Sequence, residues 1–205
     1  MAIRMTLVCH AATASMRTTA FPEDEPIEDR AMPRIAALAS RLRRVDRSWT
    51  APERRTRQTS ETLHQAAQVE PIPLVETELR ECDYGRWRGR SFADIQQVEG
   101  GQALLAWSAD PAAAPHGGET LLAMLERTAA WLDRQAGTSG HGLVVAHAST
   151  IRGLVLHAIG APPASFWRID IAPLSLTTLS FNRQWRLGSA GCTMSADQAS
   201  DTQLS

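Results

Sequence analysis

The stretch Thr6-Leu7-Val8-Cys9-His10-Ala11-Ala12-Thr13 decides the fold that we expect for this chain. Its first four residues form a short apolar run with high strand propensity, which is typical of a buried strand. The run stops at a histidine, which small and hydroxyl residues follow. Ligands of open α/β sheets bind beyond the carboxyl ends of the strands, so His10 is placed where a side chain can do chemistry. One such histidine is more often structural than catalytic, so a catalytic site here requires further residues that lie beside it.

A second strand of the same kind occurs late in the chain. Residues 142–147, Gly-Leu-Val-Val-Ala-His, form the clearest strand pattern, a continuous apolar run typical of the centre of a parallel sheet. It also ends in a histidine, His147, and a predicted helix follows to residue 159, where Gly160 ends it. Because neighbouring parallel strands end at the same edge of a sheet, we expect His10 and His147 to lie close together.

The rest of the chain alternates strand patterns with amphipathic helical patterns. Strands are expected at 3–9, 45–50, 71–76, 166–171 and 174–181, with a hairpin partner at 184–187. Helices are expected at 30–44, 52–68, 91–99, 102–107 and 119–135, and long loops at 11–30 and 110–118. The alternation predicts an α/β fold with a mostly parallel central sheet flanked by helices in three layers. We expect a single domain over residues 1–188 and a disordered polar tail over 189–205.

Composition narrows the classes of function. The 205 residues carry a net charge of -1, which gives no general attraction to nucleic acid or to an anionic membrane. The chain contains no lysine, which excludes lysine Schiff-base chemistry and a P-loop lysine. Three widely spaced cysteines are expected to be reduced thiols, and no stretch approaches the ~20 apolar residues of a membrane span. We therefore expect a cytoplasmic protein that binds neither nucleic acid nor membrane.

Two charged segments supply further candidates for a site. Pro52 suits a helix start, and an arginine in the following turn, Arg55, could bind a phosphate together with the helix N-terminus. Basic residues are dense around this segment, but aromatic residues are not interleaved with them, so a solvated helix face is favoured over a nucleic-acid patch. In the loop 79–89, Glu81 stands near Tyr84 and Trp87, and partial desolvation would suit it to proton transfer.

Two other kinds of site fit the sequence less well. A phosphatase nucleophile at Cys9 would require an arginine six positions later, where the chain has Ser15, so Cys9 is expected to be a buried thiol. A metal site built from His10, Glu81, Glu119 and His147 would need a spacing that no standard motif supplies. We predict no metal and no other cofactor. The other histidines, at 64, 116, 141 and 157, are expected to be structural or exposed.

Five segments in order resemble the motifs of the histidine phosphatase superfamily, whose fold is like that of phosphoglycerate mutase. They are residues 7–13, 52–59, 79–89, 117–120 and 144–152. The resemblance implies that His10 is the nucleophile and that Arg55 binds the phosphate. It also implies that Glu81 donates the proton and that His147 is the second catalytic histidine.

The chain departs from the family pattern beside the predicted nucleophile. Cys9, Ala11 and Met16 stand where the family has arginine, glycine and asparagine, so two donors to the phosphoryl oxygens are missing. Arg17 is a candidate replacement, although a solvated arginine is an equally good interpretation. With Arg55, Arg17, Thr13 and Ala148 complete the predicted substrate-binding set.

The resemblance implies a phosphomonoester hydrolase that acts through a phosphohistidine on a small phosphorylated metabolite. A hydrolase is favoured over a mutase because 205 residues leave little room for mutase insertions. Since two donors are missing, we expect weak activity. The alternative is a catalytically impaired phospho-ligand-binding or protein-interaction module on the same fold. Whether the chain forms a homodimer is left open.

Overall fold

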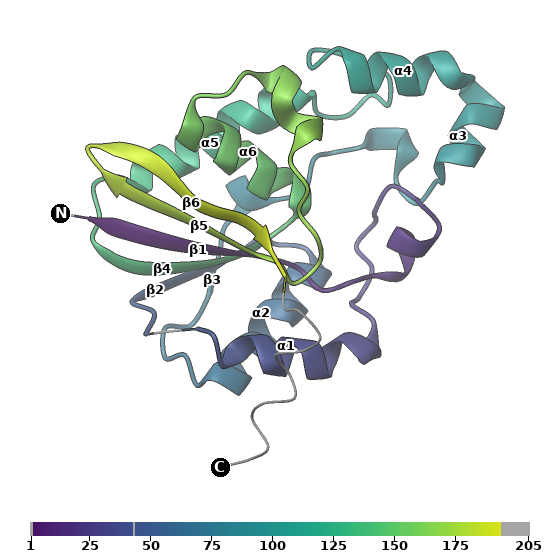
Figure 1. Cartoon of the computed structure of the whole chain (residues 1–205). Coiled ribbons are helices and arrows are strands. Elements are labelled where there is room, and N and C mark those ends of the chain that lie inside the picture. Colours follow the sequence, from purple (N-terminus) through teal and green to yellow (C-terminus); the bar gives the residue numbers. More distant parts are fainter. Residues whose placement is uncertain (1, 43, 194–205) are drawn as a thin grey trace.

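The computed structural model describes residues 2–42 and 44–193, and one mixed sheet organises them (Figure 1). The strand order of this six-stranded sheet is β3-β2-β4-β1-β5-β6. The strands are β1 (Ile3–Cys9), β2 (Arg47–Thr50), β3 (Leu74–Val75), β4 (Gly140–Ala146), β5 (Leu176–Asn182) and β6 (Gln184–Cys192). β1, β2, β3 and β4 run parallel to one another, whereas β5 is antiparallel to both β1 and β6. The predicted α/β fold with a mostly parallel sheet is confirmed.

Helices cover both faces of the sheet, which gives the three layers visible in Figure 1. One face carries α1 (Met32–Ala39) and α2 (Arg54–Ala67), and the other carries α5 (Leu121–Gln135) and α6 (Ala148–Ile159). Two further helices, α3 (Phe92–Glu99) and α4 (Gly101–Ala109), lie beyond the end of the sheet. None of the helices in the described residues is long and apolar enough to cross a membrane.

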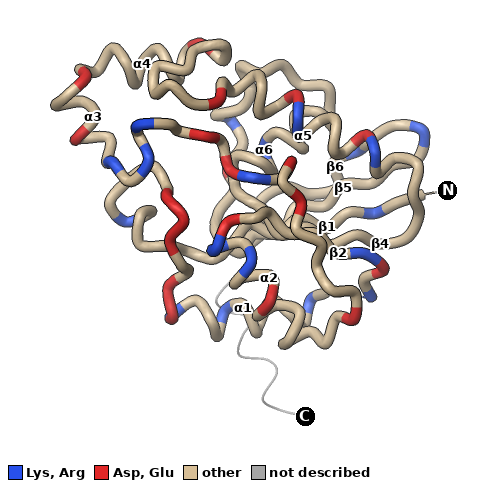
Figure 2. Tube along the Cα trace, turned by 180° about the vertical axis from the view of Figure 1, so that it is seen from behind, with Lys and Arg blue, Asp and Glu red and all other residues tan. Residues whose placement is uncertain are grey.

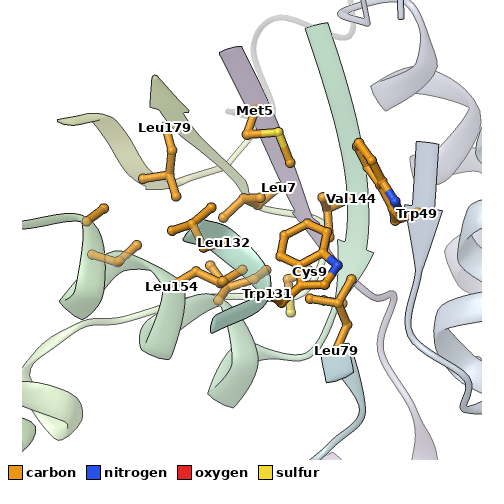
Figure 3. Close-up of a cluster of buried hydrophobic side chains, with 14 of the residues drawn as sticks. Met5, Leu7, Cys9, Trp49, Leu79, Trp131, Leu132, Val144, Leu154 and Leu179 are labelled. Carbon is orange, nitrogen blue, oxygen red and sulfur yellow. The ribbon is translucent and has the colours of Figure 1, made fainter. Parts of the chain in front are cut away.

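Strand alternation divides the β1 side chains between two hydrophobic clusters. Met5, Leu7 and Cys9 belong to the cluster that includes residues of α5 and α6, while Val8 belongs to the cluster under α1 and α2. Figure 3 shows Cys9 among the side chains of the first cluster, to which Trp131 also belongs. The last residue of β1 therefore points into the core, and the chain turns from there into the site.

The structure corrects several predicted boundaries. Residues 166–171 are not a strand, because a 3-10 helix covers Pro163–Arg168 and Ile169 only caps it. Proline at its first position favours this helical turn, and Phe166 packs against α5 and α6 residues instead of joining the sheet. The expected tail boundary at 189 is wrong as well, because β6 pairs with β5 as far as Cys192. The helix expected at 30–44 ends at Ala39. Residues 194–205 of the predicted tail lie outside the described residues.

Candidate active site

His10 directly follows β1, and its imidazole is buried and held in one orientation. Its backbone N–H donates to the Ala146 carbonyl of β4 at 3.0 Å, which ties the two strand ends together. Nδ1 lies 2.7 Å from the Ala11 carbonyl oxygen. A carbonyl can only accept, so the proton is on Nδ1 and the lone pair of Nε2 is available. Burial, and then the charges of His147 and Arg55, lower the pKa of His10 well below its usual 6.5, so the ring is neutral at pH 7.

His147 caps α6 at the end of the neighbouring strand β4, and Glu53 fixes its orientation. The two histidine rings lie 5.2 Å apart between centroids in an edge-on arrangement. His147 is fully buried, and its Nε2–H donates to the Glu53 carboxylate at 2.7 Å. Burial acts to raise the pKa of Glu53, but the hydrogen bond and charge of His147, with the backbone amide of Glu81, lower it to about 2. The Glu53 carboxylate is therefore ionised at neutral pH.

Glu81 reaches the same point from the loop 79–89. Its Oε2 lies 3.4 Å from Arg55 Nη2 and 3.5 Å from His147 Nδ1. Its Oε1 accepts the Cys82 backbone N–H at 3.0 Å and the hydroxyl of Ser149. The carboxyl group thus lies between the buried arginine and the second histidine, where it can exchange a proton with a bound group.

Arg55 is the buried cation of the site. It lies in the first turn of α2, its side chain is only 1% exposed, and Nη1 donates to the Glu23 carbonyl at 2.5 Å. Nη1 is also 3.9 Å from Glu25 Oε2, and Nε has no hydrogen-bond partner among the described residues. A buried guanidinium with a free N–H is suited to bind an anion such as phosphate.

Contacts from the opposite face hold the Glu81 loop in place. Arg127 of α5 donates to the Glu78 carbonyl at 2.7 Å and to the Glu81 carbonyl at 3.3 Å. The same guanidinium forms a hydrogen-bonded ion pair with Glu119 at 2.7 Å. Thr150 of α6 donates to the carbonyls that precede Glu81. The backbone around Glu81 is therefore fixed independently of any ligand.

A cavity of about 480 Å³ opens beside these groups. Figure 2 shows acidic and basic positions intermingled around this end of the sheet. The lining residues are Pro22, Glu23, Asp24, Glu25, Glu53, Arg55, Glu81, Cys82 and Arg88. Among the residues that the structure describes, no three His, Cys, Asp or Glu side chains converge closely enough to hold a metal ion. The site offers an anion-binding arginine, a neutral histidine and carboxylates.

The structure brings His10, Arg55, Glu81 and His147 together at the carboxyl ends of the parallel strands. Thr13 is buried nearby, where its hydroxyl is 3.0 Å from that of Ser15. Ala148 is the first residue of α6.

Arg17 and Cys9 have surroundings other than the cavity. Arg17 lies in a short 3-10 helix (Ala14–Arg17), where its exposed side chain pairs with Glu28. Arg17 does not line the cavity. Its partner in this structure is Glu28 and not the predicted phosphate site. Cys9 is 2% exposed, and burial raises the pKa of its thiol to about 12, with a smaller contribution from Glu81. The expectation of a buried thiol at Cys9 is confirmed.

Three residues of the site escaped the sequence reasoning: Glu53, Ser149 and Arg88. Glu53 lies in the segment 52–59 and Ser149 in the segment 144–152, and both segments were already identified as motifs. An acidic residue two positions before a phosphate-binding arginine is the signal that could have identified Glu53. Nothing in the sequence shows that it would contact His147, 94 residues later.

Comparisons with known proteins identify the family and the fold of this chain. The family model of the histidine phosphatase superfamily (branch 1) matches residues 5–190. A 2,3-bisphosphoglycerate-dependent phosphoglycerate mutase of Cytophaga hutchinsonii is 29% identical over 106 residues, which cover 49% of this chain and 50% of the mutase. A glucosyl-3-phosphoglycerate phosphatase of Mycolicibacterium vanbaalenii is 30% identical over 97 residues, 43% of either chain. These matches thus span about half the length of the curated relatives or less.

Solved structures show the fold over nearly the whole chain. A mycobacterial glucosyl-3-phosphoglycerate phosphatase in complex with VO3 has a TM-score of 0.82 and 24% identity, over 93% of this chain and 99% of that one. The alpha-ribazole phosphatase of Shigella flexneri has a TM-score of 0.82 and 21% identity, over 92% of this chain and 96% of that one. At such identities these likenesses show the fold alone. Since the family model spans most of the sequence, the chain belongs to branch 1 of the histidine phosphatase superfamily.

Proposed function

We propose that this chain hydrolyses a small phosphomonoester through a phosphohistidine formed at His10. The observation that carries the proposal is the state of His10: a neutral ring with its proton on Nδ1 and Nε2 available, beside a buried arginine. A neutral imidazole nitrogen is a competent nucleophile, and the cation offsets charge on the phosphoryl oxygens.

In the first step, Nε2 of His10 forms a bond to phosphorus while the ester P–O bond breaks. Glu81, in its protonated form, gives its proton to the leaving oxygen, and the alcohol departs. In the second step, water attacks phosphorus, Glu81 takes a proton from the water, and the P–N bond breaks to release phosphate and neutral His10. Arg55 and His147 bind the phosphoryl oxygens in both steps.

The relatives support the class of substrate. Proteins similar to this chain are named as phosphatases of glucosyl-3-phosphoglycerate and of alpha-ribazole phosphate, and one solved relative is a complex with inorganic phosphate. All of these are small phosphorylated molecules or phosphate itself. The particular metabolite is left to experiment.

The test is a phosphatase assay with p-nitrophenyl phosphate and a panel of phosphorylated metabolites. We expect slow turnover that His10→Ala abolishes and that His157→Ala, at a partly exposed histidine paired with Asp133, leaves unchanged. Rapid quenching in base should trap phosphate on the natural chain, because phosphohistidine is stable in base and labile in acid. Turnover that survives His10→Ala would refute the mechanism.

A second candidate, a phospho-ligand-binding module without turnover, is favoured by one observation. The resemblance places Cys9 where the family has an arginine, and the Cys9 thiol is packed into the core. Loss of one preorganised donor typically costs about 10²–10³ in rate, and Met16 removes a second donor. Cys9→Arg should raise the rate if the pocket keeps the family shape. No turnover in either the natural chain or Cys9→Arg would favour the binding module.

A further inference from the structure

The cavity beside the catalytic groups has an unusual charge for a phosphate site. Its lining holds five carboxylates, Glu23, Asp24, Glu25, Glu53 and Glu81, against the guanidinium groups of Arg55 and Arg88. A bound phosphate dianion adds further negative charge to this wall. Charges a few ångströms apart near a protein surface interact by several kcal/mol, so such an excess affects which esters can bind.

Both arginines of the cavity already have carboxylate neighbours. Arg55 Nη2 is 3.4 Å from Glu81 and Nη1 is 3.9 Å from Glu25. Arg88 Nε lies 3.5 Å from Asp83. Nε of the buried Arg55 has no hydrogen-bond partner among the described residues, so the hydrogen-bonding capacity of this lining guanidinium is not fully used. The cavity combines a site for an anion with an acidic surround.

Glu25 is the carboxylate best placed to act on a ligand. Its Oε1 accepts the Ser15 hydroxyl at 2.7 Å, which holds the side chain still, while Oε2 has no hydrogen-bond partner in the described residues. Burial acts to raise the pKa of Glu25, but the Ser15 hydrogen bond and the charge of Arg55 outweigh it and lower the pKa. Glu25 is therefore an ionised carboxylate that lines the cavity, with Oε1 held by Ser15 and Oε2 buried 3.9 Å from Arg55.

Two of the other carboxylates have structural partners. Asp24 accepts the Arg54 backbone N–H at 2.6 Å at the start of α2, and Glu53 accepts from His147. No three ligating side chains among the described residues converge as a metal site, which argues against a bare metal ion as the balancing charge. A substituted ammonium needs no such convergence, because an ionised carboxylate attracts it without fixed coordination geometry.

We propose that the cavity binds a phosphomonoester whose alcohol part carries an organic cation, with the phosphate at Arg55 and the cation facing Glu25. This inference rests on the proposed phosphatase function and specifies its substrate class. Glu25 then selects the substrate, since it attracts a cationic ester and repels one that carries a second anion.

The test compares three phosphate esters of similar size. Phosphocholine carries a quaternary ammonium, 3,3-dimethylbutyl phosphate is its uncharged isostere, and 3-phosphoglycerate carries a carboxylate. We expect kcat/KM for phosphocholine to exceed that for the isostere by about tenfold or more, as one carboxylate near the ammonium would give, and 3-phosphoglycerate to be the poorest. Glu25→Gln should remove most of the preference for the cation. The control Glu61→Gln, on the exposed side of α2, should keep it.

The outcomes separate the two proposals. Turnover that depends on His10 but is equal for phosphocholine and the isostere, or unchanged in preference by Glu25→Gln, overturns the cation inference alone. If none of the esters is turned over, the phosphatase proposal fails for this class, and calorimetric binding of the same three esters to the natural chain decides the inference. Tighter binding of phosphocholine that Glu25→Gln abolishes supports it, and equal affinities overturn it.

Discussion

Glu53→Gln tests the carboxylate that holds the second histidine. One oxygen of Glu53 accepts the His147 Nε2–H at 2.7 Å and the other accepts the Glu81 backbone N–H at 3.0 Å. Glutamine has one accepting oxygen, so one of these donors must face an amide NH2 group. The substitution keeps the size of the side chain and removes its charge and one hydrogen bond.

The pKa of Glu53 gives the magnitude. A pKa lowered from 4.5 to about 2 in the folded chain corresponds to about 3 kcal/mol of folding free energy at neutral pH. Because the folded-state pKa is depressed, this stability is present above the unfolded pKa of 4.5 and is lost as the pH falls toward 2. We expect Glu53→Gln to lower the free energy of unfolding by about 2–3 kcal/mol at pH 7. At pH 3 the difference from the natural chain should be smaller by about 2 kcal/mol.

Urea denaturation followed by tryptophan fluorescence measures the difference in free energy of unfolding at pH 7 and at pH 3. Glu61→Gln, on the same helix but exposed, should leave the free energy of unfolding almost unchanged at both pH values. If Glu53→Gln destabilises the chain equally at pH 7 and pH 3, the ionised carboxylate does not contribute the predicted stability.

Three further predictions concern thiols, a tight loop contact and metals. Ellman's reagent at pH 8 should modify the exposed Cys192 of the native chain and leave Cys9 unmodified, because burial raises the pKa of Cys9 to about 12. Rapid modification of a Cys82→Ala/Cys192→Ser variant, whose remaining thiol is Cys9, would contradict this. Gly118→Ala should lower the free energy of unfolding by about 2 kcal/mol or more, because a Cβ there would lie 2.0 Å from the Asp83 carbonyl oxygen. The control Gly137→Ala, with nothing within 4 Å of its Cβ, should be neutral or stabilising in the same urea titration. Phosphatase activity should survive EDTA, because a guanidinium supplies the positive charge, and loss of activity that one divalent ion restores would contradict this.

Local sequence patterns predicted most of the elements. The run that ends at Cys9 gave β1 with its observed bounds, because an apolar segment of that length cut off by polar residues has few alternatives to a buried strand. The helix after His147 ends at Gly160, which adopts the left-handed conformation that glycine accepts without steric cost. The strand predicted at 166–171 was wrong, because its alternation of apolar and polar residues also fits a 3-10 helix that buries Phe166.

What the sequence by itself determined is the set of residues at the strand ends: a histidine after each of two buried strands, an arginine at a helix start and a glutamate in a loop between them. Only the tertiary structure decided their electrostatics. Glu53 meets His147 across 94 residues, Glu25 comes within 3.9 Å of Arg55, and Arg17 pairs with Glu28 outside the cavity. The physical reason is one of range. Strand and helix patterns arise from neighbours along the chain, whereas the charge of a site is the sum over side chains that only folding brings within a few ångströms.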